Sequence, residues 1–271
     1  MVASVSNGSA VSERLDGGGL RMLMQPIIDL RSGEVRQVEA LARLAADDQP
    51  GGDLLDPAEF LPLLDADGID RLFREGLDHS LAALSSWDSR GLHLSVSVNL
   101  APSTLRNPDC PDWVVAVLNR HGMTGDRLVL ELLETDVLES AGELVSIARL
   151  RGLGVAIALD DFGSGHSNAA RLSVVAVDYV KLDSGVTTRL RAAIAGARDT
   201  VAELIDLGRA AGCGIVWEGI DTAADLDLAR QWETDLGQGF YLAHPMPADQ
   251  VPAWVLAHRI RWRAIQRGVS G

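Results

Sequence analysis

The sequence predicts an α/β fold in which strands and helices alternate around a closed parallel barrel with an irregular beginning. The chain has 271 residues, and a single β/α barrel typically takes about 250. About eight short apolar runs recur along it, and the later ones alternate with amphipathic stretches. Arg31-Ser32-Gly33 separates two apolar runs over 21–44, which is typical of a hairpin. The alternation alone leaves an open, doubly wound sheet as the alternative.

The period of the apolar residues indicates each element in turn. Residues 92–100 alternate strictly between apolar and polar side chains, which predicts a strand with one buried face. Further strands are predicted at 127–134, 155–161, 178–183 and 214–220, with a weaker one at 236–242. Helices are predicted between them at 69–90, 113–121, 142–151, 193–211 and 222–234. Residues 1–19 are rich in Ser and Gly, so we expect a flexible leader before one domain over 20–271.

Charge and cysteine content exclude several classes of protein. The chain has 24 basic and 38 acidic residues, a formal net charge of −14. Such a surface repels DNA or RNA duplexes and anionic membranes, so a phosphate-bearing partner has to be small and locally neutralised. Two cysteines without a CxxC motif indicate a reducing compartment. Since no apolar run approaches about 18 residues, we expect a cytoplasmic protein without a membrane partner.

The polar residues suited to catalysis or metal binding all lie at the carboxyl end of a predicted strand. They are Asn99, Glu131, Glu134, Asp160, Asp161, Lys181, Asp183, Glu218 and Gln238. In an α/β barrel the carboxyl ends of the strands form the active site. Each residue alone is equally well explained as the start of a solvated loop or as a helix cap. Their coincidence at consecutive strand ends favours a functional interpretation.

The chemistry of this set points to divalent cations. Several neighbouring carboxylates cannot all remain ionised without neutralising cations. Carboxylate and amide oxygens suit hard ions such as Mg²⁺ or Mn²⁺. Adjacent aspartates are able to serve two ions, and paired ions are a common device for phosphodiester hydrolysis. A lysine among these acids would orient water or offset phosphate charge.

Seven ordered motifs resemble those of one known family. EALAR at 39–43 matches its signature and follows Gln25-Pro26-Ile27, while ELLE at 131–134 resembles its ExTE motif. DDFGSGHS at 160–167 resembles DDFGTGYS, and DYVKLD at 178–183 resembles DxxKID. WEGID at 217–221 resembles AEGVE, and GQGF at 237–240 resembles GQGY. From about residue 20 to 255 the sequence resembles the EAL-domain cyclic-di-GMP phosphodiesterases.

The resemblance implies a TIM-type (β/α)8 barrel with one antiparallel strand near the N-terminus, and a role for each matched residue. Glu39, Asn99, Glu131 and Asp160 would hold one metal ion, and Asp160 with Asp161 the second. Lys181 and Glu218 would organise the attacking water, and Glu134 would brace the loop that begins at Asp160. Contacts to the dinucleotide would come from Gln25, Leu41, Arg43, Asp183 and Gln238.

The activity implied is hydrolysis of cyclic-di-GMP to linear pGpG with two Mg²⁺ or Mn²⁺ ions. The alternative is a weak or inactive domain that binds cyclic-di-GMP or a protein partner. The intact set of acids, Asn and Lys favours the enzyme. Leu133 in place of Thr, Asp221 in place of Glu and an altered loop after Asp161 bear on rate and regulation. In the family the segment 160–175 contributes to a dimer face, so a homodimer is expected, and an upstream signal would arrive through a partner.

Overall fold

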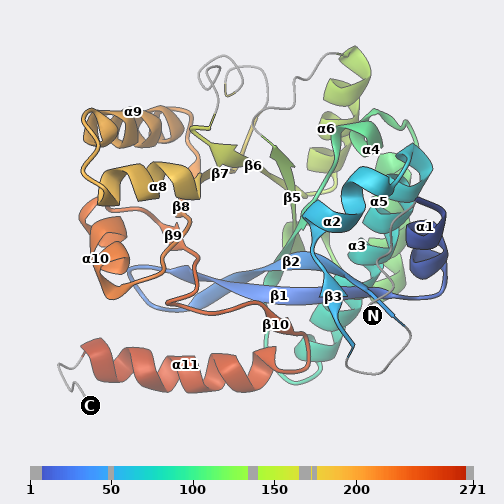
Figure 1. Cartoon of the computed structure of the whole chain (residues 1–271), viewed down its shortest axis with the longest axis horizontal. Coiled ribbons are helices and arrows are strands. Elements are labelled where there is room, and N and C mark those ends of the chain that lie inside the picture. The colour runs from blue at the N-terminus through green and yellow to red at the C-terminus, as the bar shows by residue number, and fades with distance from the viewer. Residues whose placement is uncertain (1–7, 48–51, 134–139, 165–171, 173–175, 267–271) are drawn as a thin grey trace.

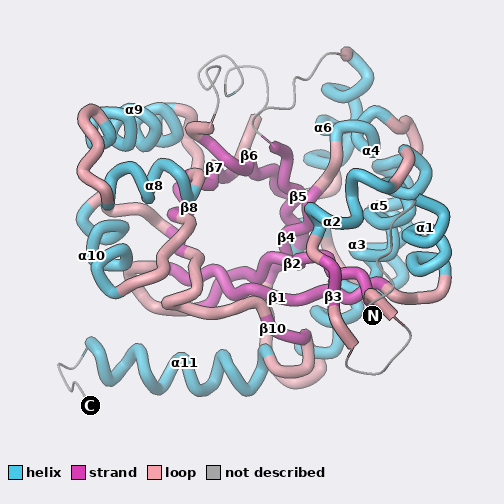
Figure 2. Tube along the Cα trace, viewed as in Figure 1, coloured by secondary structure: helices cyan, strands magenta, loops and turns pink. Residues whose placement is uncertain are grey.

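The computed structural model describes residues 8–47, 52–133, 140–164, 172 and 176–266, and a closed ring of strands is its central feature (Figure 2). Within these ranges eight strands form the ring, which confirms the predicted barrel. In ring order they are β1 (Leu20–Asp29), β2 (Val35–Ala45), β4 (Ser95–Asn99), β5 (Leu128–Leu133), β6 (Ala156–Phe162), β7 (Tyr179–Leu182), β8 (Gly214–Trp217) and β9 (Leu236–Gly237).

Strand β1 is antiparallel to both of its neighbours in the ring, β2 and β9. The remaining neighbours, from β2 round to β9, pair in parallel. The hairpin predicted around Arg31-Ser32-Gly33 is therefore the β1–β2 unit, in which Gln25 lies opposite Glu39. Two short strands, β3 (Leu54–Leu55) and β10 (Met246–Pro247), extend the sheet outside the ring on β2 and β1.

Helices surround the ring on its outer side (Figure 1). They are α2 (Pro57–Phe60), α3 (Ala66–Asp88), α4 (Pro102–Arg106), α5 (Cys110–His121), α6 (Ala141–Gly152), α8 (Ser184–Arg191), α9 (Ala197–Ala210), α10 (Ala223–Gln231) and α11 (Val251–Gln266). The main core fills the space between these helices and the outer face of the strands. Among the described residues, no helix is both long enough and apolar enough to cross a membrane.

The interior of the barrel carries an apolar floor beneath a polar layer. Ile27, Val216 and Leu236 are buried against one another. Three polar residues lie two positions away from them on the same strand or its exit: Gln25 from Ile27, Glu218 from Val216, and Gln238 from Leu236. Since side chains two residues apart share one face of a strand, the polar residues also point into the barrel. The floor separates the polar layer from the amino-terminal mouth.

Two expectations from the sequence are wrong in detail. Residues Gly8–Asp16, expected within a flexible leader, form helix α1, whose Val11 packs with Leu44 and Phe60. The helix offers only two buried side chains, too few to show a period. The helix expected at 193–211 is α9, which begins only at Ala197 because Ala193 and Gly196 have positive φ angles of 50° and 81° that interrupt helical geometry. Helix α8, which ends at Arg191, was not predicted.

Candidate active site

Neighbouring strands bring the predicted site residues together at the carboxyl end of the barrel. Asn99 at the end of β4 lies opposite Glu131 in β5, and Glu39 in β2 is one strand further round. Lys181 enters from β7 on the other side of the ring. The side chains of Glu131 and Lys181 are almost completely buried, with residue exposures of 1% and 2%. Charged groups at this depth require partners, and the geometry shows which ones.

The ammonium group of Lys181 lies at the centre of four carboxylates among the described residues. Its Nζ is 2.9 Å from Glu131 Oε2, 2.9 Å from Glu218 Oε1, 3.0 Å from Asp160 Oδ1 and 3.3 Å from Glu39 Oε2. These acids come from four different strands or strand exits, so the cluster exists only when the barrel is closed. One ammonium group faces four acidic side chains, so the cluster holds more negative than positive charge when the acids are ionised.

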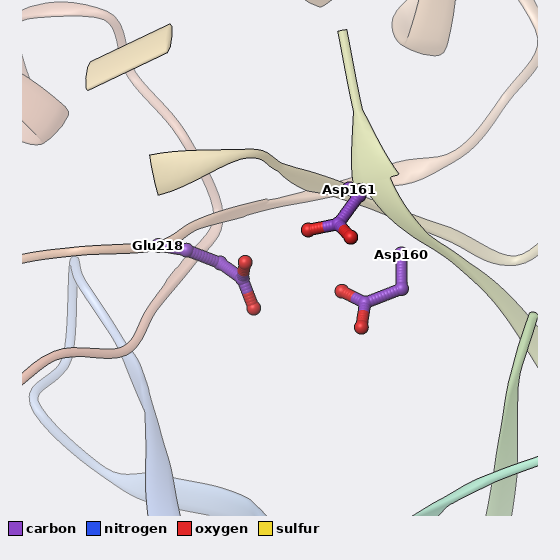
Figure 3. Close-up of side chains that lie close together, drawn as sticks. All are labelled: Asp160, Asp161 and Glu218. Carbon is purple, nitrogen blue, oxygen red and sulfur yellow. The ribbon is translucent and has the colours of Figure 1, made fainter. Parts of the chain in front are cut away.

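A bulge in β6 directs two consecutive aspartates toward the same site. The register between β6 and β7 shifts after Leu159, and Asp161 has a φ of 54°, a left-handed conformation that is uncommon outside glycine. Figure 3 shows the carboxylates of Asp160, Asp161 and Glu218 turned toward one another. One oxygen from each lies within 4.8 Å of the others, a spacing that suits a shared cation. The strained backbone at Asp161 therefore coincides with the convergence of these three carboxylates.

Two glutamines hold the carboxylate of Glu39 in place. Gln238 Nε2 donates to Glu39 Oε2 at 2.8 Å and lies 2.9 Å from Gln25 Oε1. Gln25 in turn donates to the carbonyl of Ala243 at 3.0 Å, and Asn99 Nδ2 lies 3.4 Å from Glu39 Oε1. The sequence predicted Gln25 and Gln238 as contacts to a substrate. In this structure both are buried and orient a candidate metal ligand, a role that only the fold reveals.

The pKa value of each acid in the cluster depends on whether its neighbours offset the cost of burying its charge. Burial disfavours charge on Glu39, but the Lys181 ammonium and the amide donors outweigh it and lower its pKa. Burial, together with Glu39 and Asp160, raises the pKa of Glu131 well above its usual value. Burial and the acids Asp160 and Glu39 raise the pKa of Glu218 to about 8. Although burial opposes its charge, the surrounding carboxylates raise the pKa of Lys181, so the lysine stays protonated.

The donor set fits a hard divalent cation. The Oε1 atom of Glu131 is buried and has no hydrogen-bond partner among the described residues, an expensive state unless a cation or proton completes it. The ligand atoms on offer are carboxylate and amide oxygens, which Mg²⁺ and Mn²⁺ prefer. Burial and the neighbouring carboxylates raise the pKa values of both Glu131 and Glu218, and a bound cation would offset this negative charge.

The other predicted residues lie at the rim or outside the described structure. Arg43 Nε pairs with Asp56 Oδ1 at 2.9 Å. Asp183 caps α8 by accepting from the amide of Gly185 at 2.9 Å, which gives it a local structural role. Glu134 lies outside the described residues, as does most of the segment 160–175 expected to form a dimer face.

An apolar cavity of about 360 Å³ opens beside the acidic cluster. Leu41, Asn99, Glu131 and Leu133 lie on its wall next to the cluster, and Phe73 of α3 forms part of the far side. Leu41 was predicted as a substrate contact from the sequence, and it lines this cavity. Phe73 was not predicted, because an aromatic residue at helical spacing is indistinguishable in sequence from an ordinary core residue.

Fold and site together define an α/β-barrel protein with an acidic centre at the carboxyl ends of its strands. The family model described as the EAL domain matches residues 9–245, and the chain belongs to that family.

Relatives named for specific activities share this domain. The cyclic di-GMP phosphodiesterase PA2567 of Pseudomonas aeruginosa is 31% identical over 239 residues, covering 88% of this chain and 40% of that protein. The oxygen sensor protein DosP of Escherichia coli is 28% identical over 255 residues, covering 92% of this chain and 31% of that protein. The chain thus spans less than half the length of either relative. A solved complex of the PaMucR phosphodiesterase with c-di-GMP superposes with a TM-score of 0.82 at 30% identity, covering 90% of this chain and 98% of that one.

Proposed function

We propose that the protein is a metal-dependent phosphodiesterase that hydrolyses cyclic-di-GMP to linear pGpG. The observation that carries this proposal is the convergence of Glu39, Glu131, Asp160 and Glu218 on Lys181 at the carboxyl end of the barrel. Relatives at about 30% identity bear that activity in their names, and a similar domain has been solved with c-di-GMP.

The same residues provide for two Mg²⁺ or Mn²⁺ ions. Glu39, Asn99, Glu131 and Asp160 would hold one ion, and Asp160 and Asp161 would hold the second with Glu218 beside them. When bound, such ions supply Lewis-acid chemistry that lowers the pKa of water and offsets charge on the phosphate.

Lys181 and Glu218 would manage the attacking water. The protonated ammonium of Lys181 orients the water, and Glu218, whose pKa of about 8 makes it a stronger base than an ordinary carboxylate, accepts the proton in its ionised form. Attack on phosphorus forms one P–O bond and breaks the bond to the 3′ oxygen, which takes up a proton and leaves as a hydroxyl. The product is linear pGpG with a 5′-phosphate.

The cavity and the rim would hold the dinucleotide. A purine is flat and largely apolar, and a cavity of about 360 Å³ lined by Leu41 and Phe73 offers a matching surface. Arg43 presents a planar guanidinium for a phosphate, provided that it exchanges its contact with Asp56. The free, buried cysteines Cys110 and Cys213 agree with a cytoplasmic location, which we include in the proposal.

The second candidate is a domain that binds cyclic-di-GMP or a protein partner without turnover. Leu133 favours it, because an apolar side chain with 41% exposure stands at the cavity beside Glu131, where the family has Thr. Incubation of the protein with cyclic-di-GMP and Mg²⁺ or Mn²⁺, followed by nucleotide chromatography, separates the two. Metal-dependent pGpG that disappears with a chelator supports the enzyme, whereas binding without product under both ions supports the second candidate.

A further inference from the structure

Helix α11 has two apolar faces, and the residues that the structure describes cover only one of them. Its inner face carries Val251, Val255 and Trp262, which are all buried. His258 fixes this face to the β1–β2 turn through a contact of 3.0 Å to the Gly33 carbonyl. In Figure 1 the helix runs along one side of the molecule, and no labelled element lies beyond it.

The outer face of α11 is an exposed apolar stripe. Ala253, Leu256, Ala257 and Ile260 are exposed and follow the spacing i, i+3, i+4 and i+7, which places them on one side of a helix. Leu256 and Ile260 are 63% and 66% exposed, among the highest values for large apolar residues in the described chain. The stripe occupies about 100° of the helix circumference, the width that a single partner helix covers.

Arginines border this stripe on both sides. At 3.6 residues per turn, Arg259 and Arg263 lie along one edge and Arg261 along the other. All three are exposed, and the segment 251–266 contains no acidic residue in a chain of net charge −14. Arg261 stacks over Trp254 at 5.9 Å, which leaves its charge at the edge of the stripe.

We propose that this face of α11 binds an amphipathic helix with acidic flanks, supplied by another polypeptide segment. The apolar residues of the partner would cover Leu256 and Ile260, and its carboxylates would pair with Arg259, Arg261 and Arg263. A second copy is a poor occupant, because two-fold pairing of α11 sets the same arginine-bordered edge against itself. An anionic membrane is also disfavoured, since Trp262 is buried, Trp254 packs half-buried against the core, and the chain as a whole is strongly acidic.

The test uses two labelled synthetic helices of 21 residues with identical leucine seams, one flanked by Glu and the other by Lys. Fluorescence anisotropy with the full chain should show binding of the Glu peptide and much weaker binding of the Lys peptide. Ile260→Asp should weaken binding by more than about tenfold, and Arg259→Glu with Arg263→Glu should reverse the preference. Val145→Asp, at an exposed residue of α6 (59%), is the matched control and should change nothing.

Four outcomes would overturn the proposal. Equal binding of both peptides would show that the arginines do not select the partner. No effect of Ile260→Asp would show that the apolar stripe is not the binding surface. Flotation with vesicles of phosphatidylcholine and phosphatidylglycerol that is lost in Ile260→Asp would assign the face to a membrane. Sedimentation of a dimer that Ile260→Asp dissociates would assign it to self-association.

Discussion

Lys181 and Glu218 form a close ion pair inside the barrel, with 2.9 Å between Nζ and Oε1. They come from β7 and from the exit of β8, two strands that pair in parallel with Lys181 opposite Val216. The pair joins a group that stays protonated to a carboxyl group that titrates near neutral pH. Because this pair lies among the candidate metal ligands, substitution of its members tests the proposed chemistry directly.

Loss of either member of this pair should lower kcat strongly and leave cyclic-di-GMP binding largely unchanged. Lys181→Met removes the group that orients water, and Glu218→Gln removes the proton acceptor. Because the two act as a unit, the double variant should be little worse than the poorer single variant. Steady-state kinetics and calorimetry measure both properties. Additive losses, or equal losses in binding and rate, would show that the residues serve separate purposes.

Glu218→Gln should stabilise the metal-free protein at pH 8. The pKa of Glu218 rises from 4.5 to about 8 on folding. Its contribution to stability is therefore present below about pH 4.5 and is lost as the pH rises through about 8. The amide has no charge to bury, and three carboxylates remain around Lys181. Thermal unfolding should give a higher Tm at pH 8, by roughly 2–4 °C for each kcal/mol recovered, and little difference at pH 5. A lower Tm at both pH values would contradict this reading.

Binding of Mg²⁺ or Mn²⁺ should tighten as the pH rises from 6 to about 8 and should release protons. Below pH 8 the raised pKa values of Glu131 and Glu218 mean that protons compete with the ion. Calorimetric titration in two buffers of different ionisation enthalpy counts the protons released. An affinity that does not vary with pH would place the ion elsewhere.

Asp160→Asn and Arg43→Ala should impair different properties. Asp160 is positioned to serve both ions, so its loss should cut turnover by about 10²-fold or more. Arg43 lies at the rim, so its loss should act mainly through KM. Near-normal turnover of Asp160→Asn would refute the two-ion assignment, and an unchanged KM in Arg43→Ala would remove its phosphate contact.

Gln238→Leu should weaken metal binding by about 10- to 100-fold, although Gln238 is not itself a candidate ligand and acts through Glu39. The variant removes the donor at 2.8 Å from Glu39 Oε2 and leaves that carboxylate free to turn. Gln238→Glu is unsuitable because it adds a charge, so Gln238→Asn, which keeps an amide, serves as the comparison. Equal metal affinity in Gln238→Leu and the parent would limit this residue to substrate contact.

Local sequence patterns were enough to predict the alternating strands and helices, the hairpin and most of the candidate acidic ligands. The period of a strand is a local property. The positions of Asn99, Glu131 and Asp160 near strand ends can therefore be predicted without knowing which strands pair. Motif order then supplied the EAL resemblance. Local signals failed at α1, because two buried residues, Val11 and Leu15, make no period.

The way in which these residues meet depends on the closed barrel and is not encoded in any local pattern. Gln25 and Gln238 are 213 positions apart in the chain, and closure of the barrel by β1 against β2 and β9 brings Gln238 into contact with both Gln25 and the carboxylate of Glu39. Lys181 becomes the centre of the acids for the same reason. Its distances to Glu39 and Glu131 depend on strand stagger around the ring, which no local pattern encodes. The titration of the site follows from that burial and crowding, so it too is a property of the closed barrel.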